Sequence, residues 1–166
     1  MTEQVSITFH KGGEKKNDTV VIESAKQKLV FKAWQHGIIP HEMVHYAVEL
    51  IFGELKGFLT LIGEGKKHDE IEDREAGVPA AYIECLVGAF QYEMWGLSAA
   101  TNEQFVSNFK HFTHKNEGDF APEQFFEFIP DNVRIERCRK LLSDLADMWG
   151  MLPDGRRVEY KLPLAG

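Results

Sequence analysis

The segment Pro40-His-Glu-Met-Val-His45-Tyr-Ala-Val-Glu-Leu50-Ile-Phe-Gly-Glu-Leu-Lys56 carries a helical pattern. Its apolar side chains recur every three to four residues, the spacing of one face of an α-helix, at Val44, Ala47, Val48, Ile51 and Leu55. The pattern predicts a helix over residues 40–56 with one face turned to the core. Proline suits the first turn of a helix, where its missing N–H group would have had no partner. The helix is therefore expected to begin close to Pro40.

Further helices are predicted between Pro79 and Gly150 by the same periodicity and by helix-start signals. Thr101-Asn-Glu-Gln104 has the pattern of a capping box, and Asp131 is a typical N-terminal cap. The predicted helices run from Pro79 to about Trp95, from Thr101 through Phe112, from Pro122 to Phe128, and from Asp131 to a stop at Gly150.

The two ends of the chain have strand patterns. Apolar residues alternate with polar ones at Val5, Ile7 and Phe9, and Thr19–Ile22 is a second β-branched run. The charged segment 11–18 between them indicates a hairpin, and alternation returns at 158–162. The predicted fold class is α+β: a helix-rich single domain over 1–166, with a small antiparallel sheet formed by the N-terminal hairpin and the C-terminal strand.

Composition excludes several classes of protein. The chain has 166 residues, of which 43% are hydrophobic and 27% charged, as in an average globular domain. Its net charge of −7 argues against a nucleic-acid partner, because nucleic-acid binders carry a basic surface. Cys85 and Cys138 lie in apolar helical stretches and indicate core residues in a reducing compartment. With no leader-like or membrane-spanning stretch, we expect a cytoplasmic protein without a membrane partner.

The motif that points to chemistry is His41-Glu42-Met43-Val44-His45, or H-E-x-x-H. Residues i and i+4 lie one above the other on a helix, so both imidazoles can reach one tetrahedral metal ion. A glutamate one position after the first histidine projects about 100° around the helix, where it can hold a metal-bound water. The helical pattern turns both histidines toward the interior and leaves Glu42, with Tyr46 and Glu49, at the edge of the apolar stripe.

This pentapeptide, flanked by Ile38, Ile39 and Tyr46, resembles the active-site helix of the zincin metallopeptidases. The resemblance covers about ten residues. It implies that His41 and His45 bind zinc and that Glu42 is the general base. In zincins the motif lies well inside its helix, whereas Pro40 places it here at the helix start, with Glu42 near position N3. The helix dipole stabilises a carboxylate there, so a role for Glu42 in the first turn is the alternative.

Glu84 is the predicted third metal ligand. It interrupts the apolar run Val78–Phe90, which is otherwise composed for burial, and buried carboxylates are seldom unpaired. Gln91 lies two turns further along the same helix face. Glu84 at the helix rim, or paired with a buried histidine or arginine, is the structural alternative. Other ligand candidates are His36 and the charged loop 64–75, a segment that also suits a flap over a cleft, through Glu64, His68, Asp69, Glu70 or Glu72.

A second resemblance covers Ile39–Glu49 together with Gly57 and Phe58. It is similar to a segment of small bacterial proteins without an assigned activity, in which the acidic residue of the motif is often aspartate. This resemblance favours a metal-binding or polar-core role for the two histidines over proteolysis.

The sequence thus supports two functional hypotheses. The first is a zinc-dependent hydrolase, a minimal peptidase or a small amide or ester hydrolase, with a small molecule or a peptide as its substrate. The second is a non-enzymatic helical binding or regulatory protein in which His41 and His45 are structural core residues. A chain of this length folds without a metal, so a bound metal would have a functional role. No pattern in the sequence sets the oligomeric state.

Overall fold

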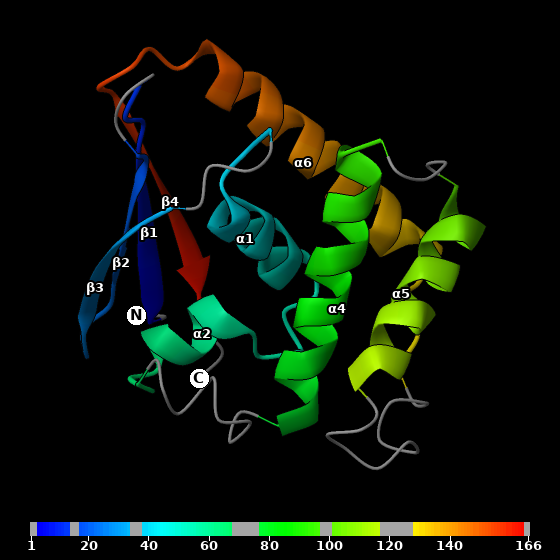
Figure 1. The fold of residues 1–166 in the computed structure, drawn as a ribbon. Helices are drawn as coiled ribbons and strands as arrows, with labels where there is room; N and C mark the ends of the chain where they lie inside the picture. The colour runs from blue at the N-terminus through cyan, green and yellow to red at the C-terminus, as the bar shows by residue number, and fades with distance from the viewer. Residues whose placement is uncertain are drawn as a thin grey trace.

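The computed structural model describes residues 3–13, 17–33, 38–67, 77–96, 101–116 and 128–164. Within these ranges the chain forms five helices and a four-stranded antiparallel sheet, which confirms the predicted helix-rich α+β class. The sheet lies on one side of the molecule and the helices on the other (Figure 1).

The sheet joins the two ends of the chain, as predicted. Its strands are β1 (Gln4–His10), β2 (Thr19–Glu23), β3 (Lys28–Lys32) and β4 (Arg157–Pro163), in the order β3-β2-β1-β4. The third strand was not predicted, although Lys-Leu-Val-Phe-Lys alternates. Its outward Val30 is exposed and its inward side chains are only half-buried, as is common for a short edge strand.

Side chains on one face of the sheet form part of the hydrophobic core. In the register, Ile7 lies opposite Ile22 on one side and Tyr160 on the other, and Val5 lies opposite Leu162. Because side chains alternate along a strand, these residues all project toward the helices. The buried ones are Val5, Ile7, Phe9, Val20, Ile22 and Leu162.

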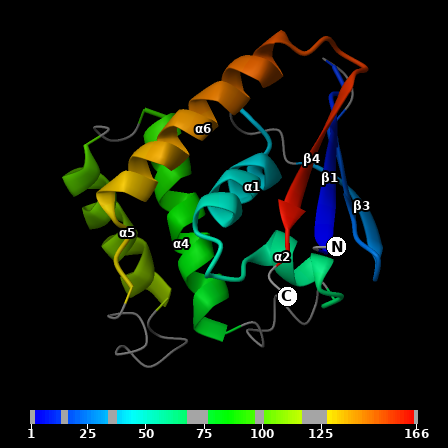
Figure 2. The ribbon, with the colours of Figure 1, turned by 180° about the vertical axis from the view of Figure 1, so that it is seen from behind.

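Helix α1 (His41–Ile51) occupies the centre of the fold. It contacts α2 (Phe58–Gly63), α4 (Gly77–Met94), α6 (Asn132–Met151) and strand β4. In Figure 1 α1 lies between the sheet and α4. Figure 2, the view from behind, shows α6 running past α1 and α4. Every residue from Glu42 to Glu49 is buried. A helix enclosed on several sides in this way can place polar side chains in a defined, dry environment.

Helix α1 is shorter than predicted. It begins at His41, with Pro40 as its N-cap, and ends at Ile51 rather than near Lys56. Leu55 is buried as its spacing predicted, but it lies in a turn that returns the chain toward α1. That turn leads into α2, a six-residue helix that the sequence analysis did not predict.

The remaining helices agree with the predictions apart from their ends. Helix α4 begins at Gly77, two residues before Pro79, and α5 spans Asn102–Asn116 with the Thr101 hydroxyl accepting from the Gln104 N–H. Helix α6 is capped by Asp131, but it continues through Gly150 to Met151 because the break comes only with Leu152 and Pro153. The predicted helix 122–128 lies outside the described residues except for Phe128. Both cysteines are buried.

Among the described helices, none combines the length and the apolar character that crossing a membrane requires.

Substitutions of two glycines are expected to change the free energy of unfolding in opposite directions. A Cβ atom at Gly63 would lie 2.9 Å from Cβ of Val5, where α2 meets the sheet, whereas one at Gly150 on α6 would meet nothing within 4 Å. Gly63→Ala should lower the free energy of unfolding by about 1–3 kcal/mol through overpacking. Gly150→Ala should raise it by about 0.5–1 kcal/mol, since alanine is the better helix former. Urea denaturation measures both changes. A Gly63→Ala protein as stable as Gly150→Ala would contradict this packing.

Candidate metal centre

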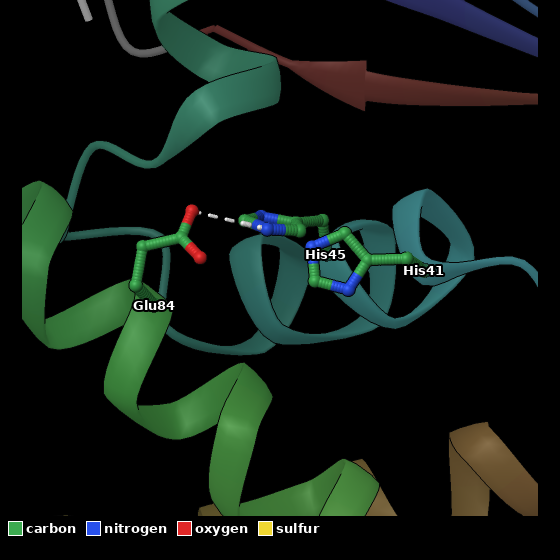
Figure 3. A group of neighbouring side chains, drawn as sticks. All are labelled: His41, His45 and Glu84. Atoms are coloured by element: carbon green, nitrogen blue, oxygen red, sulfur yellow. Dashed lines mark ion pairs between the residues drawn. The ribbon is translucent and has the colours of Figure 1, made fainter. Parts of the chain in front are cut away.

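Helices α1 and α4 bring the three predicted ligands together. His41 and His45 come from the first two turns of α1, and Glu84 reaches them from α4 (Figure 3). One ligand atom from each residue lies within 4.8 Å of the other two. The two imidazole rings stand edge to face, with centroids 4.8 Å apart. This group could hold a metal ion, because two imidazole nitrogens and a carboxylate oxygen are ligands that divalent metals accept.

His45 is held between two carboxylates. Its ring is almost completely buried, with Nδ1 3.1 Å from Oε2 of Glu49 and Nε2 3.2 Å from Oε1 of Glu84. The contact with Glu49 fixes the plane of the ring and leaves Nε2 facing the cluster. A carboxylate bound to the second nitrogen of a metal-binding histidine is a recurrent arrangement, because it sets the ring orientation and makes the ligand more basic.

Glu49 is itself fixed by α2. Its carboxylate accepts hydrogen bonds from the backbone N–H groups of Leu59 (3.1 Å) and Thr60 (2.9 Å) and from the Thr60 hydroxyl (2.8 Å). These are the second and third residues of α2, whose own N-cap, Gly57, has no side chain to bond them. Glu49 therefore takes the part of an N-capping side chain from a different helix.

Gly57 leaves the space that this carboxylate fills. A Cβ atom at Gly57 would lie 2.6 Å from Cδ of Glu49 and 2.6 Å from Cγ2 of Ile83, both inside van der Waals contact. The backbone at Gly57 is extended, so the requirement for glycine comes from this close approach rather than from its dihedral angles. The segment Gly57-Phe-Leu-Thr60 thus supplies both the space for the Glu49 carboxylate and the hydrogen-bond donors that hold it.

His41 is oriented from α4. Its Nδ1 lies 2.8 Å from Nε2 of Gln91, two turns along α4 from Glu84. Figure 3 shows the other ring nitrogen turned toward His45 and Glu84. A neutral His41 that binds a metal through Nε2 carries its proton on Nδ1, and the Gln91 amide then presents its oxygen. A half-turn of the amide exchanges its nitrogen and oxygen without changing its shape.

The two histidines differ in protonation. Burial alone would lower the pKa of His45, but Glu84 and Glu49 outweigh it and raise this pKa to about 10. Burial and the repulsion from His45 lower the pKa of His41. Partial burial opposes ionisation of Glu84, yet attraction to His45 dominates and lowers the pKa of its carboxyl. Near neutral pH His41 is therefore neutral in the metal-free cluster, whereas His45 is an imidazolium between two carboxylates.

Glu42 is buried beside this cluster. It occupies position N2 of α1, not N3 as expected, because Pro40 is the N-cap and His41 the first helical residue. Among the residues that the structure describes, none forms a hydrogen bond with its side-chain Oε2. Burial raises the pKa of its carboxyl, although its own backbone N–H and the nearby His45 favour the charged form. A carboxyl of this kind is suited to taking up a proton.

Glu84 is less enclosed than its sequence context predicted. Its neighbours Ile83 and Cys85 are buried, whereas 55% of the Glu84 side chain is exposed. Glu84 is therefore a half-exposed carboxylate paired with the buried His45, which is the structural alternative that the sequence left open. The cluster consequently has a solvent-facing side at Glu84, and its deep side is closed by Glu49.

The other ligand candidates do not join the described cluster. Glu64 forms an ion pair with Lys56 at 2.9 Å. His36 and the loop candidates His68, Asp69, Glu70 and Glu72 lie outside the described residues, as does most of the loop 64–75. Among the described residues, the group found is His41, His45 and Glu84.

Sequence reasoning missed the residues that orient the two imidazoles. Glu49 was assigned to the edge of the apolar stripe, yet it is fully buried. Its i, i+4 spacing from His45 is the signal that could have identified it, since such pairs face each other on a helix. Gln91 was placed on the face of Glu84, but its contact with His41 depends on how α1 and α4 pack.

The raised pKa of His45 makes the stability of the metal-free protein depend on pH. The folded state holds this proton more tightly than the unfolded state, so its contribution is complete below pH 6.5 and is lost as pH rises through about 10. With chelator present, we expect the free energy of unfolding to fall between these pH values. NMR of the imidazole nitrogens should show His45 as imidazolium at pH 8. A neutral ring at that pH would contradict the two-carboxylate clamp.

No protein-family model, curated protein or solved structure matches this chain, so the geometry of the cluster bears the functional interpretation alone.

Proposed function

We propose that this chain is a zinc-dependent hydrolase in which His41, His45 and Glu84 bind the metal and Glu42 is the general base. The observation that carries the proposal is the convergence of the three ligand atoms within 4.8 Å. The second nitrogen of each imidazole is already engaged, by Glu49 and by Gln91. Histidines tethered in this way are typical of metal sites.

The donor set favours zinc in a catalytic rather than a structural role. Two histidines and one carboxylate form a three-ligand set that catalytic zinc sites use, in which a fourth position stays free for water or substrate. The exposed side at Glu84 gives that position access to solvent. A chain of this size has no need of a metal to remain folded.

Different residues of the chain have different roles in the proposed hydrolysis. The zinc ion supplies a polarised, acidic water and a Lewis acid for the substrate carbonyl. Glu42 accepts the proton from the attacking water and passes it to the leaving group. Its raised pKa and its buried oxygen, to which no described residue forms a hydrogen bond, suit it to this role. Glu49 and Gln91 keep the two imidazoles in place. The substrate is a small amide, ester or peptide.

The second candidate is a non-enzymatic binding or regulatory protein. It is favoured by the contacts of His45, whose two ring nitrogens are both paired with carboxylates without a metal. In that case Glu84 and Glu49 serve as hydrogen-bond acceptors that allow a charged histidine to be buried, and Glu42 stabilises the start of α1. Metal binding separates the two candidates.

Titration of chelator-treated protein with ZnCl₂, followed by calorimetry, should show one zinc ion bound per chain. His41→Ala and Glu84→Gln should each weaken binding by more than about 100-fold, beyond the 10–100-fold loss typical of a supporting residue. The matched controls are His111→Ala and Glu103→Gln, which alter exposed side chains on α5. Binding that survives both cluster variants, or a wild-type protein that binds no zinc, would contradict the proposal.

Glu42→Gln tests the assigned base. Zinc affinity should be unchanged, while zinc-dependent hydrolysis of p-nitrophenyl acetate should fall by about 100-fold or more, the usual contribution of a general base. Glu103→Gln is the control for removing a carboxylate elsewhere. Full activity in Glu42→Gln would show that Glu42 serves only the first turn of α1. Zinc-loaded protein that hydrolyses neither activated esters nor small peptides would contradict the hydrolase itself.

A further inference from the structure

A hollow of about 410 Å³ opens between α4 and α5, beside the cluster. Its size falls within the range of sites that take small molecules. Three aromatic rings line it, those of Tyr92, Trp95 and Phe112, together with the polar side chains of Asn108 and His111. Among the described residues that line it, none is a lysine, an arginine or a carboxylate. An uncharged, aromatic ligand is the chemistry that such a lining favours.

Glycines at two points help to shape the hollow. Gly88 lines it, and a Cβ atom there would be in ordinary van der Waals contact with the ring of Phe112, at 3.6 Å, so glycine leaves this face of the Phe112 ring without a side chain against it from position 88. Gly96, with φ of 72°, follows directly after Trp95, where α4 ends. Trp95 is 49% exposed. A large exposed aromatic side chain bordering a hollow is a common feature of binding surfaces.

The hollow and the cluster lie along one face of α4. Glu84, Gly88, Gln91 and Trp95 follow one another at spacings of four, three and four residues, so they share a helix face. Gln91 belongs to both features, since it lines the hollow and contacts Nδ1 of His41. A zinc–imidazole bond is about 2 Å long, so an ion on His41 would lie within about 7 Å of the Gln91 amide nitrogen.

We propose that this hollow is the substrate-specificity pocket of the metal centre and accepts an uncharged aromatic side group. The inference rests on the proposed hydrolase and names its substrate class: amides or esters with an aromatic ring a few bonds from the scissile carbonyl. The ring packs among Tyr92, Trp95 and Phe112, and the carbonyl is directed past Gln91 to the exposed side of the cluster.

The first experiment measures the hollow in chelator-treated protein. NMR titration should show N-acetylphenylalaninamide binding at least about tenfold more tightly than N-acetylalaninamide, the smaller end of the discrimination that an apolar pocket provides. Gly88→Leu places a side chain against the Phe112 ring within the lining and should reduce this preference to less than twofold. Trp95→Ala removes one wall at an exposed position and should weaken it in a protein that still folds. Met151→Ala, another exposed apolar side chain, should leave it unchanged.

The second experiment measures the link to the metal in zinc-loaded protein, using hydroxamates as metal-binding probes. 3-Phenylpropanohydroxamate should bind at least about tenfold more tightly than acetohydroxamate, and Gly88→Leu should remove this gain while keeping wild-type zinc affinity. Zinc binding without any phenyl preference would overturn the pocket and leave the hydrolase standing. A phenyl preference without zinc binding would overturn the proposed hydrolase and, with it, the substrate role of the hollow.

Discussion

The carboxylate of Glu49 is a charged group in the interior, and the arrangement around it explains much of the centre of this fold. Removing a carboxylate from water costs several kcal/mol unless its oxygens are well paired. Here two backbone N–H groups, one hydroxyl and the imidazole of His45 meet it. Helix α2, which has no capping side chain of its own, gains a cap in the same contact. The carboxylate thus joins α1 to α2 and fixes His45 at once.

From this contact the features of the cluster follow in order. With Nδ1 of His45 occupied, its Nε2 is directed at Glu84 on α4, and Gln91 on the same helix sets the ring of His41. The ligands therefore come from two packed helices rather than from loops, which restricts the variation in the distances between the ligand atoms. The deep side of the cluster is closed and its Glu84 side is open, as a site that exchanges small molecules requires.

Local patterns were enough to predict most of the elements, though not α2 or β3. They also selected His41, His45 and Glu84, because helix periodicity places the first two on one face and Glu84 stands out in an apolar run. They were not enough for Glu49. Its burial depends on Gly57 and the N-terminus of α2, which meet it only after the chain turns back. The six residues of α2 carry too little periodicity to be recognised, and the edge strand β3 buries too little. The exposure of Glu84 likewise depends on how α4 is rotated against α1.

Anomalous diffraction at the zinc edge, from crystals grown with zinc, tests the central claim most directly. We expect one site at full occupancy, about 2.0–2.2 Å from a nitrogen of His41, from Nε2 of His45 and from a carboxylate oxygen of Glu84. The contact of Glu49 with Nδ1 of His45 should persist when zinc is bound. A cluster without anomalous density, in which His45 and Glu84 keep their direct 3.2 Å contact, would contradict the account.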